Sequence, residues 1–298
     1  MKIPQFKKTV IALLGCISLF VFFFLGGVSL MMARQGSFTS NREELVILFP
    51  SIGATTPQIV AKAAVVFDPS NGRILYAKHA YEQLPLASIT KLMTAQIVLS
   101  EVKPETLVRI TPSSLEPQGD WGFKVDDVLP LYDLVKIGLV ASSNDAMQAA
   151  AQSLGTNYIE RMNQVARNLG LTATYFLNPT GLDVTTTTSG SYGSAYDVAR
   201  LTALFYKQYP LFFEMTQQSN VSIQVQGRVL TSHATAEPLL SIPGFVGAKT
   251  GYTDLAGGNL VAVFDVEIGH PLVAVVLAST KEGRFSDIRT LISAVRNH

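Results

Sequence analysis

The sequence has little cysteine, little histidine and almost no net charge. Cys16 is the single cysteine among 298 residues, so the chain can form no internal disulfide. The four histidines lie far apart, without the spacing of metal ligands, which argues against a zinc peptidase. A net charge of +1 leaves no basic surplus for holding a nucleic-acid backbone. We therefore expect neither a metal site nor a nucleic-acid partner.

A long apolar run lies near the amino terminus. Residues 9–33 contain no charged side chain, and a helix of this length can cross a bilayer core that is about 30 Å thick. Three lysines precede the run and only Arg34 follows it closely, which by the positive-inside rule places residues 1–8 in the cytoplasm. We therefore expect a single-pass transmembrane helix in the cell membrane, with the rest of the chain outside the cytoplasm.

Two other interpretations of this segment stay open. A cleaved signal peptide also begins with positive charge and an apolar stretch, although no convincing small-x-small cleavage motif is present. Lipidation of Cys16 is the second alternative, but the apolar region before this cysteine is short and the one after it is long. Residues 34–56 are rich in Ser, Thr, Gly and Pro, and we interpret them as a tether.

Residues 57–298 are expected to form one domain of mixed α/β class. Two β-strands at residues 63–68 and 73–78 flank a Pro-Ser-Asn-Gly turn, which is typical of a hairpin. Apolar periodicity predicts helices in the middle of the chain, then two strands and a last helix, at residues 88–102, 128–140, 145–154, 157–169, 197–206, 258–266, 272–279 and from 284. This order predicts an antiparallel sheet flanked by helices plus an all-helical lobe, with a cleft between them.

Three short motifs follow one another along the chain. They are Ser-Ile-Thr-Lys at residues 88–91, Ser-Ser-Asn at residues 142–144 and Lys-Thr-Gly at residues 249–251. The first motif alone carries little weight, because a second Ser-x-x-Lys copy runs from Ser100 to Lys103. The other two patterns occur once each and in this order, so the conjunction indicates a serine acyl-transfer site.

Ser88 and Lys91 have the types and the spacing of a nucleophile and its base. A serine hydroxyl attacks an amide when an adjacent base takes its proton. Residues three positions apart share one face of a helix, so Lys91 can reach Ser88. A lysine acts as a base only if its pKa falls far below about 10.4, and burial near a second cation such as Lys249 would lower it.

Four sequence blocks extend these motifs, and together they resemble a known family. The blocks are Pro-Leu-Ala-Ser-Ile-Thr-Lys-Leu-Met-Thr (85–94), Ala-Ser-Ser-Asn-Asp-Ala (141–146), Asn-Pro-Thr-Gly-Leu-Asp (178–183) and Lys-Thr-Gly-Tyr-Thr-Asp-Leu-Ala-Gly (249–257). They resemble the penicillin-interacting serine D-alanyl-D-alanine carboxypeptidases, whose motif set is close to that of the class A β-lactamases. The resemblance covers roughly residues 57–295 and implies a β-lactamase/transpeptidase-like fold.

The resemblance also implies a role for each motif residue. Ser142 would relay a proton to the leaving amine, and Asn144 would bind the substrate backbone and hold Lys91. Lys249 and Thr250 would bind the terminal carboxylate of the substrate. Gly251 would let the acyl group approach the strand, and the oxyanion hole would be formed by the backbone N–H groups of Ser88 and Tyr252.

These roles lead to an expected function that needs no cofactor. The substrate class is peptidoglycan stem peptides, from which the enzyme would release the terminal D-alanine through an acyl-Ser88 intermediate. β-Lactam antibiotics would acylate the same serine and stay bound, because the Glu-x-x-x-Asn motif of class A β-lactamases is missing. A D,D-endopeptidase that cleaves peptide cross-links and a catalytically silent wall-binding homologue are the alternatives.

Four smaller expectations concern the surroundings of the site. Thr180 stands where the family often has histidine, in a block that we interpret as a structural turn. Trp121 is interpreted as a packed loop aromatic, and Asp145 as the cap of the helix that follows it. The Lys-Thr-Gly motif is expected on an inner strand with a local irregularity, because regular alternation would point Lys249 and Thr250 to opposite faces.

Overall fold

The computed structural model of the chain describes residues 56–119 and 121–296. The expected cytoplasmic tail at residues 1–8, the expected transmembrane helix at residues 9–33 and almost all of the expected tether lie outside the described residues. Within the described part of the chain, every helix is too short or too polar to span a membrane.

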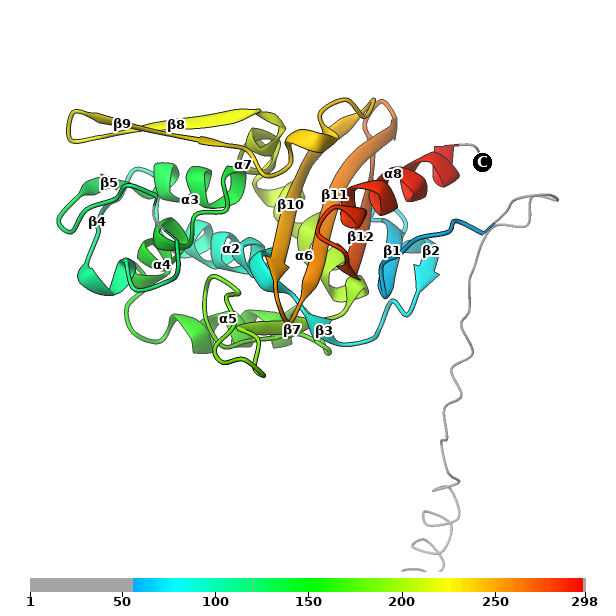
Figure 1. Cartoon of the computed structure of the whole chain (residues 1–298), viewed down its shortest axis with the longest axis horizontal. Helices are drawn as coiled ribbons and strands as arrows, with labels where there is room; N and C mark the ends of the chain where they lie inside the picture. Colours follow the sequence, from blue (N-terminus) through cyan, green and yellow to red (C-terminus); the bar gives the residue numbers. More distant parts are fainter. Residues whose placement is uncertain (1–55, 120, 297–298) are drawn as a thin grey trace, which may run out of the picture. The chain divides into compact units, whose positions relative to one another are not determined.

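A five-stranded antiparallel sheet joins the two ends of the described chain (Figure 1). Its strand order is β10–β11–β12–β1–β2, and Val65 of β1 lies opposite Val275 of β12. The predicted hairpin at residues 63–78 is confirmed, and the two strands predicted after residue 257 are present and longer than predicted. The strands are β1 (Ala63–Asp68), β2 (Arg73–Lys78), β10 (Phe245–Thr253), β11 (Gly257–Glu267) and β12 (His270–Ser279).

Alternating side chains of the sheet face two separate hydrophobic clusters. Val65 and Val263 belong to the larger cluster, which includes apolar residues of α6 (Ala195–Gln208). Their neighbours on the opposite face pack against α8 (Gly283–Arg296), as Phe264 does. Because successive strand residues point to opposite faces, one apolar strand sequence can supply both layers. The sheet is therefore covered by helices on both sides (Figure 1).

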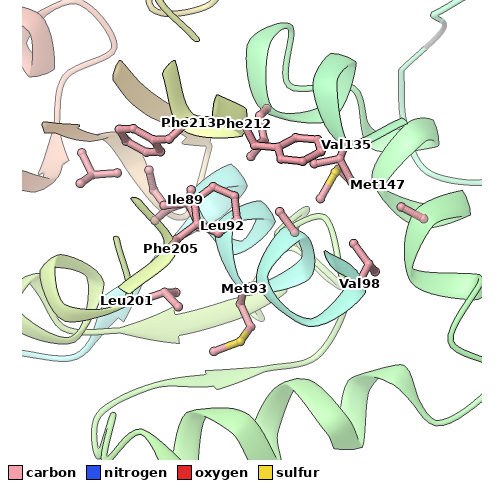
Figure 2. Packing of buried hydrophobic residues seen from close by; sticks show 14 of the residues in the cluster. Ile89, Leu92, Met93, Val98, Val135, Met147, Leu201, Phe205, Phe212 and Phe213 are labelled. Atoms are coloured by element: carbon pink, nitrogen blue, oxygen red, sulfur yellow. The ribbon is translucent and has the colours of Figure 1, made fainter. Parts of the chain in front are cut away.

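The helical lobe is built around α2 (Lys91–Glu101), whose first nine residues are all buried. Around it lie α3 (Leu131–Val140), α4 (Asn144–Gln152) and α5 (Tyr158–Asn168). Figure 2 shows Leu92 and Met93 of α2 among side chains of the surrounding elements, such as Met147 and Phe205. Burial on every side fixes the direction of α2 and of Lys91 at its amino end.

Smaller elements connect the sheet and the lobe. They include α7 (Pro210–Glu214), the pair β4 (Leu107–Arg109) and β5 (Val128–Pro130), the three-stranded sheet of β3 (Leu84–Pro85), β7 (Ser191–Gly193) and β6 (Tyr175–Phe176), and the hairpin of β8 (Asn220–Val225) and β9 (Arg228–His233). Short 3-10 helices lie at Ala87–Thr90 (η1), Pro112–Ser114 (η2), Met215–Gln217 (η3) and Glu237–Leu239 (η4).

Three of the predicted boundaries were wrong. The helix predicted at residues 88–102 starts as η1, so Ser88 lies in a 3-10 turn and α2 begins at Lys91. The helix predicted at residues 128–140 begins only at Leu131, because Pro130 adopts an extended conformation and residues 128–130 pair with β4. Asp145 is not the cap of α4, since Ser143 caps it by accepting the N–H of Ala146.

Candidate active site

The turn that carries Ser88 is held tightly between two neighbouring segments. Ala87 has a φ of 49°, so the chain bends sharply just before Ser88. A Cβ on Gly181 would lie 1.8 Å from the carbonyl oxygen of Ala87, and one on Gly251 would lie 2.9 Å from that of Leu86. Glycine at these two positions therefore allows the loop at Gly181 and strand β10 to contact the turn that carries Ser88 directly.

Lys91 lies fully buried with its amine against the hydroxyl of Ser88. Its Nζ is 2.5 Å from Oγ of Ser88, 2.8 Å from Oδ1 of Asn144 and 3.0 Å from the carbonyl oxygen of Thr180. Burial, together with the nearby charge of Lys249, lowers the pKa of Lys91 well below its usual value and favours the uncharged amine. An uncharged amine has two N–H groups, which fit the two carbonyl acceptors, and one lone pair, which then faces Ser88.

Asn144 connects Lys91 to the loop that contains Gln118. Its Oδ1 accepts from Lys91, and its Nδ2 donates to the carbonyl oxygen of Gln118 at 2.6 Å. These two contacts fix the orientation of the amide, because a carbonyl cannot donate a hydrogen bond. The residue is the first of α4, so a well-packed helix also holds its backbone.

Lys249 forms a second buried amine in the same site. Its Nζ donates to Oγ of Ser142 at 2.9 Å and to the carbonyl oxygen of Thr250 at 3.0 Å. Burial, with a contribution from the charge of Arg284, lowers the pKa of Lys249 to about 7. Ser142 has a φ of 62°, which is an unfavourable conformation for serine. The hydroxyl of this same residue accepts the hydrogen bond from Lys249.

The strand of the Lys-Thr-Gly motif differs from the expectation in two ways. It is β10, which forms an edge of the five-stranded sheet and not an inner position. Its pairing with β11 is regular at Lys249, Thr250 and Gly251, and the register shift lies earlier, between Phe245 and Gly247. The expected irregularity at the motif is therefore absent, and the long side chain of Lys249 turns back to the carbonyl of the next residue.

A cavity of about 1170 Å³ lies between the lobe and the end of β10; Ser88 and the two lysines do not line it, but Gln118 and Thr180, whose carbonyls accept from Asn144 and Lys91, do. Gln118, Thr180 and Tyr252 line the part that adjoins the residues described above, while Gln152 and Thr186 lie among the residues that line the rest. Trp121 does not line this cavity and packs against the larger hydrophobic cluster, as predicted. Within the described residues, no group of three His, Cys, Asp or Glu side chains could hold a metal ion.

Residues 51–281 match the family model of the D-alanyl-D-alanine carboxypeptidases (peptidase family S11). The chain belongs to this carboxypeptidase family. It is 28% identical over 254 residues to the D-alanyl-D-alanine carboxypeptidase DacA of Haemophilus influenzae, and this match covers 80% of the chain and 63% of DacA. It is 29% identical to a D-alanyl-D-alanine endopeptidase of Pseudomonas aeruginosa, over 81% of the chain and 79% of that relative.

Solved structures of carboxypeptidase-family proteins have the same fold. The ampicillin-bound penicillin-binding protein D2 of Listeria monocytogenes has a TM-score of 0.71 at 28% identity, covering 80% of this chain and 98% of that one. A D-alanyl-D-alanine carboxypeptidase from Mycobacterium tuberculosis has a TM-score of 0.76 at 24% identity, covering 83% of this chain and 95% of that one. The chain thus spans less than two thirds of several curated carboxypeptidases that it matches, but nearly all of these two solved structures.

The structure also adds residues of this carboxypeptidase-family site that the sequence did not reveal. Thr180 and Gln118 contribute main-chain carbonyls, and a carbonyl leaves no mark on residue type. Arg284 was predicted only as the start of the last helix, yet its Nη1 donates to the carbonyl oxygen of Gly251 at 2.6 Å. The Asn-Pro-Thr-Gly block was the one available signal, since its turn brings Thr180 to Lys91.

Proposed function

We propose that the protein is a serine D-alanyl-D-alanine carboxypeptidase that removes the terminal D-alanine of peptidoglycan stem peptides through an acyl-Ser88 intermediate. One observation carries the proposal above the others. The buried amine of Lys91 lies 2.5 Å from the hydroxyl of Ser88, while two fixed carbonyl acceptors take its N–H groups. This is the arrangement that a general base needs in order to accept a serine proton.

Acylation then follows in a balanced sequence of steps. Oγ of Ser88 attacks the carbonyl carbon of the bond between the two D-alanines, and its proton passes to the lone pair of Lys91. The oxyanion is bound by the backbone N–H groups of Ser88 and Tyr252. A proton returned through Ser142 to the leaving nitrogen breaks the C–N bond and releases free D-alanine, and water later hydrolyses the ester.

Binding of the substrate carboxylate falls to the β10 side of the site. Lys249 supplies a positive charge and Thr250 a hydroxyl; both residues are buried, and Lys249 contacts Ser142. β10 is an edge strand, so an extended peptide can lie along it without displacing another strand. The peptide would continue past Tyr252 into the cavity of about 1170 Å³, which Tyr252 helps to line.

β-Lactam antibiotics are proposed as covalent inhibitors of the same serine. The support is the similarity to penicillin-binding protein D2, whose solved structures include ampicillin-bound and cefotaxime-bound forms. The sequence has no Glu-x-x-x-Asn motif of the kind that drives deacylation in class A β-lactamases. The penicillin ester of Ser88 is therefore expected to be long-lived.

Cleavage of peptide cross-links is the second candidate activity. Two relatives named D-alanyl-D-alanine endopeptidase match this chain at 29% identity, and the chain covers 79% and 78% of their lengths. That coverage exceeds the 63% found for DacA at 28% identity. The motif residues determine how the donor is acylated and do not determine which amine leaves, so the same site can serve both reactions.

The proposal also places the catalytic domain outside the cytoplasm. Its support is the sequence alone, namely the uncharged run at residues 9–33 and the three lysines before it. Protease treatment of intact and of lysed cells tests this location. Digestion of the catalytic domain in spheroplasts supports it, whereas protection until lysis would contradict it.

Labelling with fluorescent penicillin tests the activity. The full chain should give a covalent band that disappears in Ser88→Ala, and mass spectrometry of the labelled protein should locate the adduct on Ser88. Absence of a Ser88-dependent band would favour the silent wall-binding homologue. Release of D-alanine from a pentapeptide, measured beside cleavage of a cross-linked dimer, separates the two peptidase activities.

A further inference from the structure

The hairpin β8–β9 reaches from the sheet side of the molecule across the helical lobe (Figure 1). It runs over α3 toward the β4–β5 pair, and Lys136 of α3 donates to the carbonyl oxygen of Ser222 at 3.3 Å. At the tip, the side chain of Arg228, the first residue of β9, binds the segment that follows the loop around Gln118. A long surface hairpin therefore ends on the loop that contacts the catalytic amide.

Arg228 makes three contacts with this segment. Its Nη1 donates to the carbonyl oxygen of Gly122 at 2.7 Å, and its Nη2 lies 2.6 and 2.5 Å from the two carboxylate oxygens of Asp127. Asp127 is buried, with 3% of its side chain exposed. Burial alone would raise the pKa of Asp127, but the hydrogen bonds from Arg228 and from the backbone N–H of Lys124, with the charges of these two residues, together outweigh it and lower the pKa of this carboxyl. Asp127 also accepts the backbone N–H of Lys124 at 2.7 Å, so this buried carboxylate ties the tip of the hairpin to the segment.

The loop is anchored at its other end as well. The hydroxyl of Ser114 donates to Oε1 of Gln152 at 2.6 Å, and Nε2 of Gln152 donates to the hydroxyl of Ser113 at 2.9 Å. Gln152 belongs to α4, the same helix that begins with Asn144. Gln118 lies between the two anchors, where its carbonyl accepts the hydrogen bond from Asn144.

We propose that Arg228 is a positioning residue for the catalytic base. By tying Gly122 and Asp127 to the hairpin, it holds the carbonyl of Gln118 against the amide of Asn144, and that amide fixes the direction of the Lys91 amine toward Ser88. The inference rests on the proposed roles of Ser88 and Lys91. The proposal gives a function to the β8–β9 hairpin, although none of the contacts described above joins this hairpin to Ser88 or Lys91.

Arg228→Gln tests the proposal, and Arg109→Gln is the matched control. Arg109 pairs with Asp126, the neighbour of Asp127, but 64% and 71% of these two side chains are exposed. Acylation is measured on the full chain at saturating fluorescent penicillin. The limiting rate is expressed per active site, counted by titration of Ser88. We expect a fall of about tenfold or more for Arg228→Gln, because small misplacements of a base are costly, and less than twofold for Arg109→Gln.

A purely structural role of Arg228 would lower the thermal midpoint and leave the rate per titrated site unchanged. That result would overturn the proposal. Arg228→Lys keeps the positive charge near Asp127 but cannot also reach Gly122, so an intermediate rate is expected, and this variant decides the matter if Arg228→Gln does not fold. If the unmodified chain gives no label, or if Ser88→Ala is labelled, the proposed function fails instead.

Discussion

Replacing Gly181 with alanine would place a methyl group inside the turn that carries the nucleophile. Gly181 has a φ of +80°, and a Cβ there would lie 1.8 Å from the carbonyl oxygen of Ala87 and 2.5 Å from Oγ1 of Thr90. Real Cβ atoms keep at least 3.0 Å from such neighbours, so the two segments must separate by 1.2 Å, the difference between 3.0 and 1.8 Å. The residues affected first are Thr180, which holds Lys91, and Ser88.

The expected cost has a conformational part and a packing part. Alanine at a positive φ costs roughly 1 kcal/mol, and overpacking of a tight contact costs roughly 1–3 kcal/mol more. The free energy of unfolding should therefore fall by about 2–4 kcal/mol. A shift of about 1 Å between nucleophile and base should slow acylation by about a hundredfold.

Gly72 provides a matched control for the conformational part. Its φ is +74°, it lies in the turn between β1 and β2, and a Cβ there would have nothing within 4 Å. Urea unfolding and the rate of penicillin acylation are measured for Gly181→Ala and Gly72→Ala. Equal losses of stability and unchanged acylation in both variants would refute the argument that the loop and the nucleophile turn are in direct contact.

Three other expectations concern buried charged groups. The pKa of Lys249 is about 7, so its positive charge is lost above that pH. The value of kcat/KM for a carboxylate-terminated peptide should therefore fall by about tenfold per pH unit above pH 7. The same fall in Lys249→Arg, which keeps its charge, would contradict this role of Lys249. Lys91→Arg keeps a permanent charge that cannot accept the proton of Ser88, and acylation should drop by about a thousandfold while the thermal midpoint shows a folded protein. Asp287→Asn weakens three hydrogen bonds, to two backbone N–H groups and a serine hydroxyl, and should lower the free energy of unfolding by roughly 2–3 kcal/mol in urea without changing the acylation rate.

The side chains of the three motifs could be found from the sequence because each motif is a short local pattern, whereas Arg284 belongs to none of them. Helical spacing alone places Lys91 on the same side as Ser88, and the structure has these two residues in contact. The motif around residues 142–144 was found as a pattern too, although which of its residues caps the helix was not. The roles assigned to Ser142 and Asn144 remain predictions.

Other parts of the site depend on long-range arrangement. The carbonyls of Gln118 and Thr180 act through the main chain, which has the same chemistry in every residue. The edge position of β10 depends on strand order, and this order is not written in any single segment. The contact between Arg228 and Asp127 joins residues that are 101 positions apart, so no local pattern could predict it.

The pairing of β1 with β12 has a consequence for how the molecule is made. Ala63 lies opposite Leu277, so an early strand must wait for a partner that is synthesised 214 residues later. Contacts of such large sequence separation slow folding and leave an apolar strand unprotected in the meantime. Ser88 is also made long before Lys249, so the proposed site cannot be complete on a nascent chain until the strands β10 to β12 have joined the sheet.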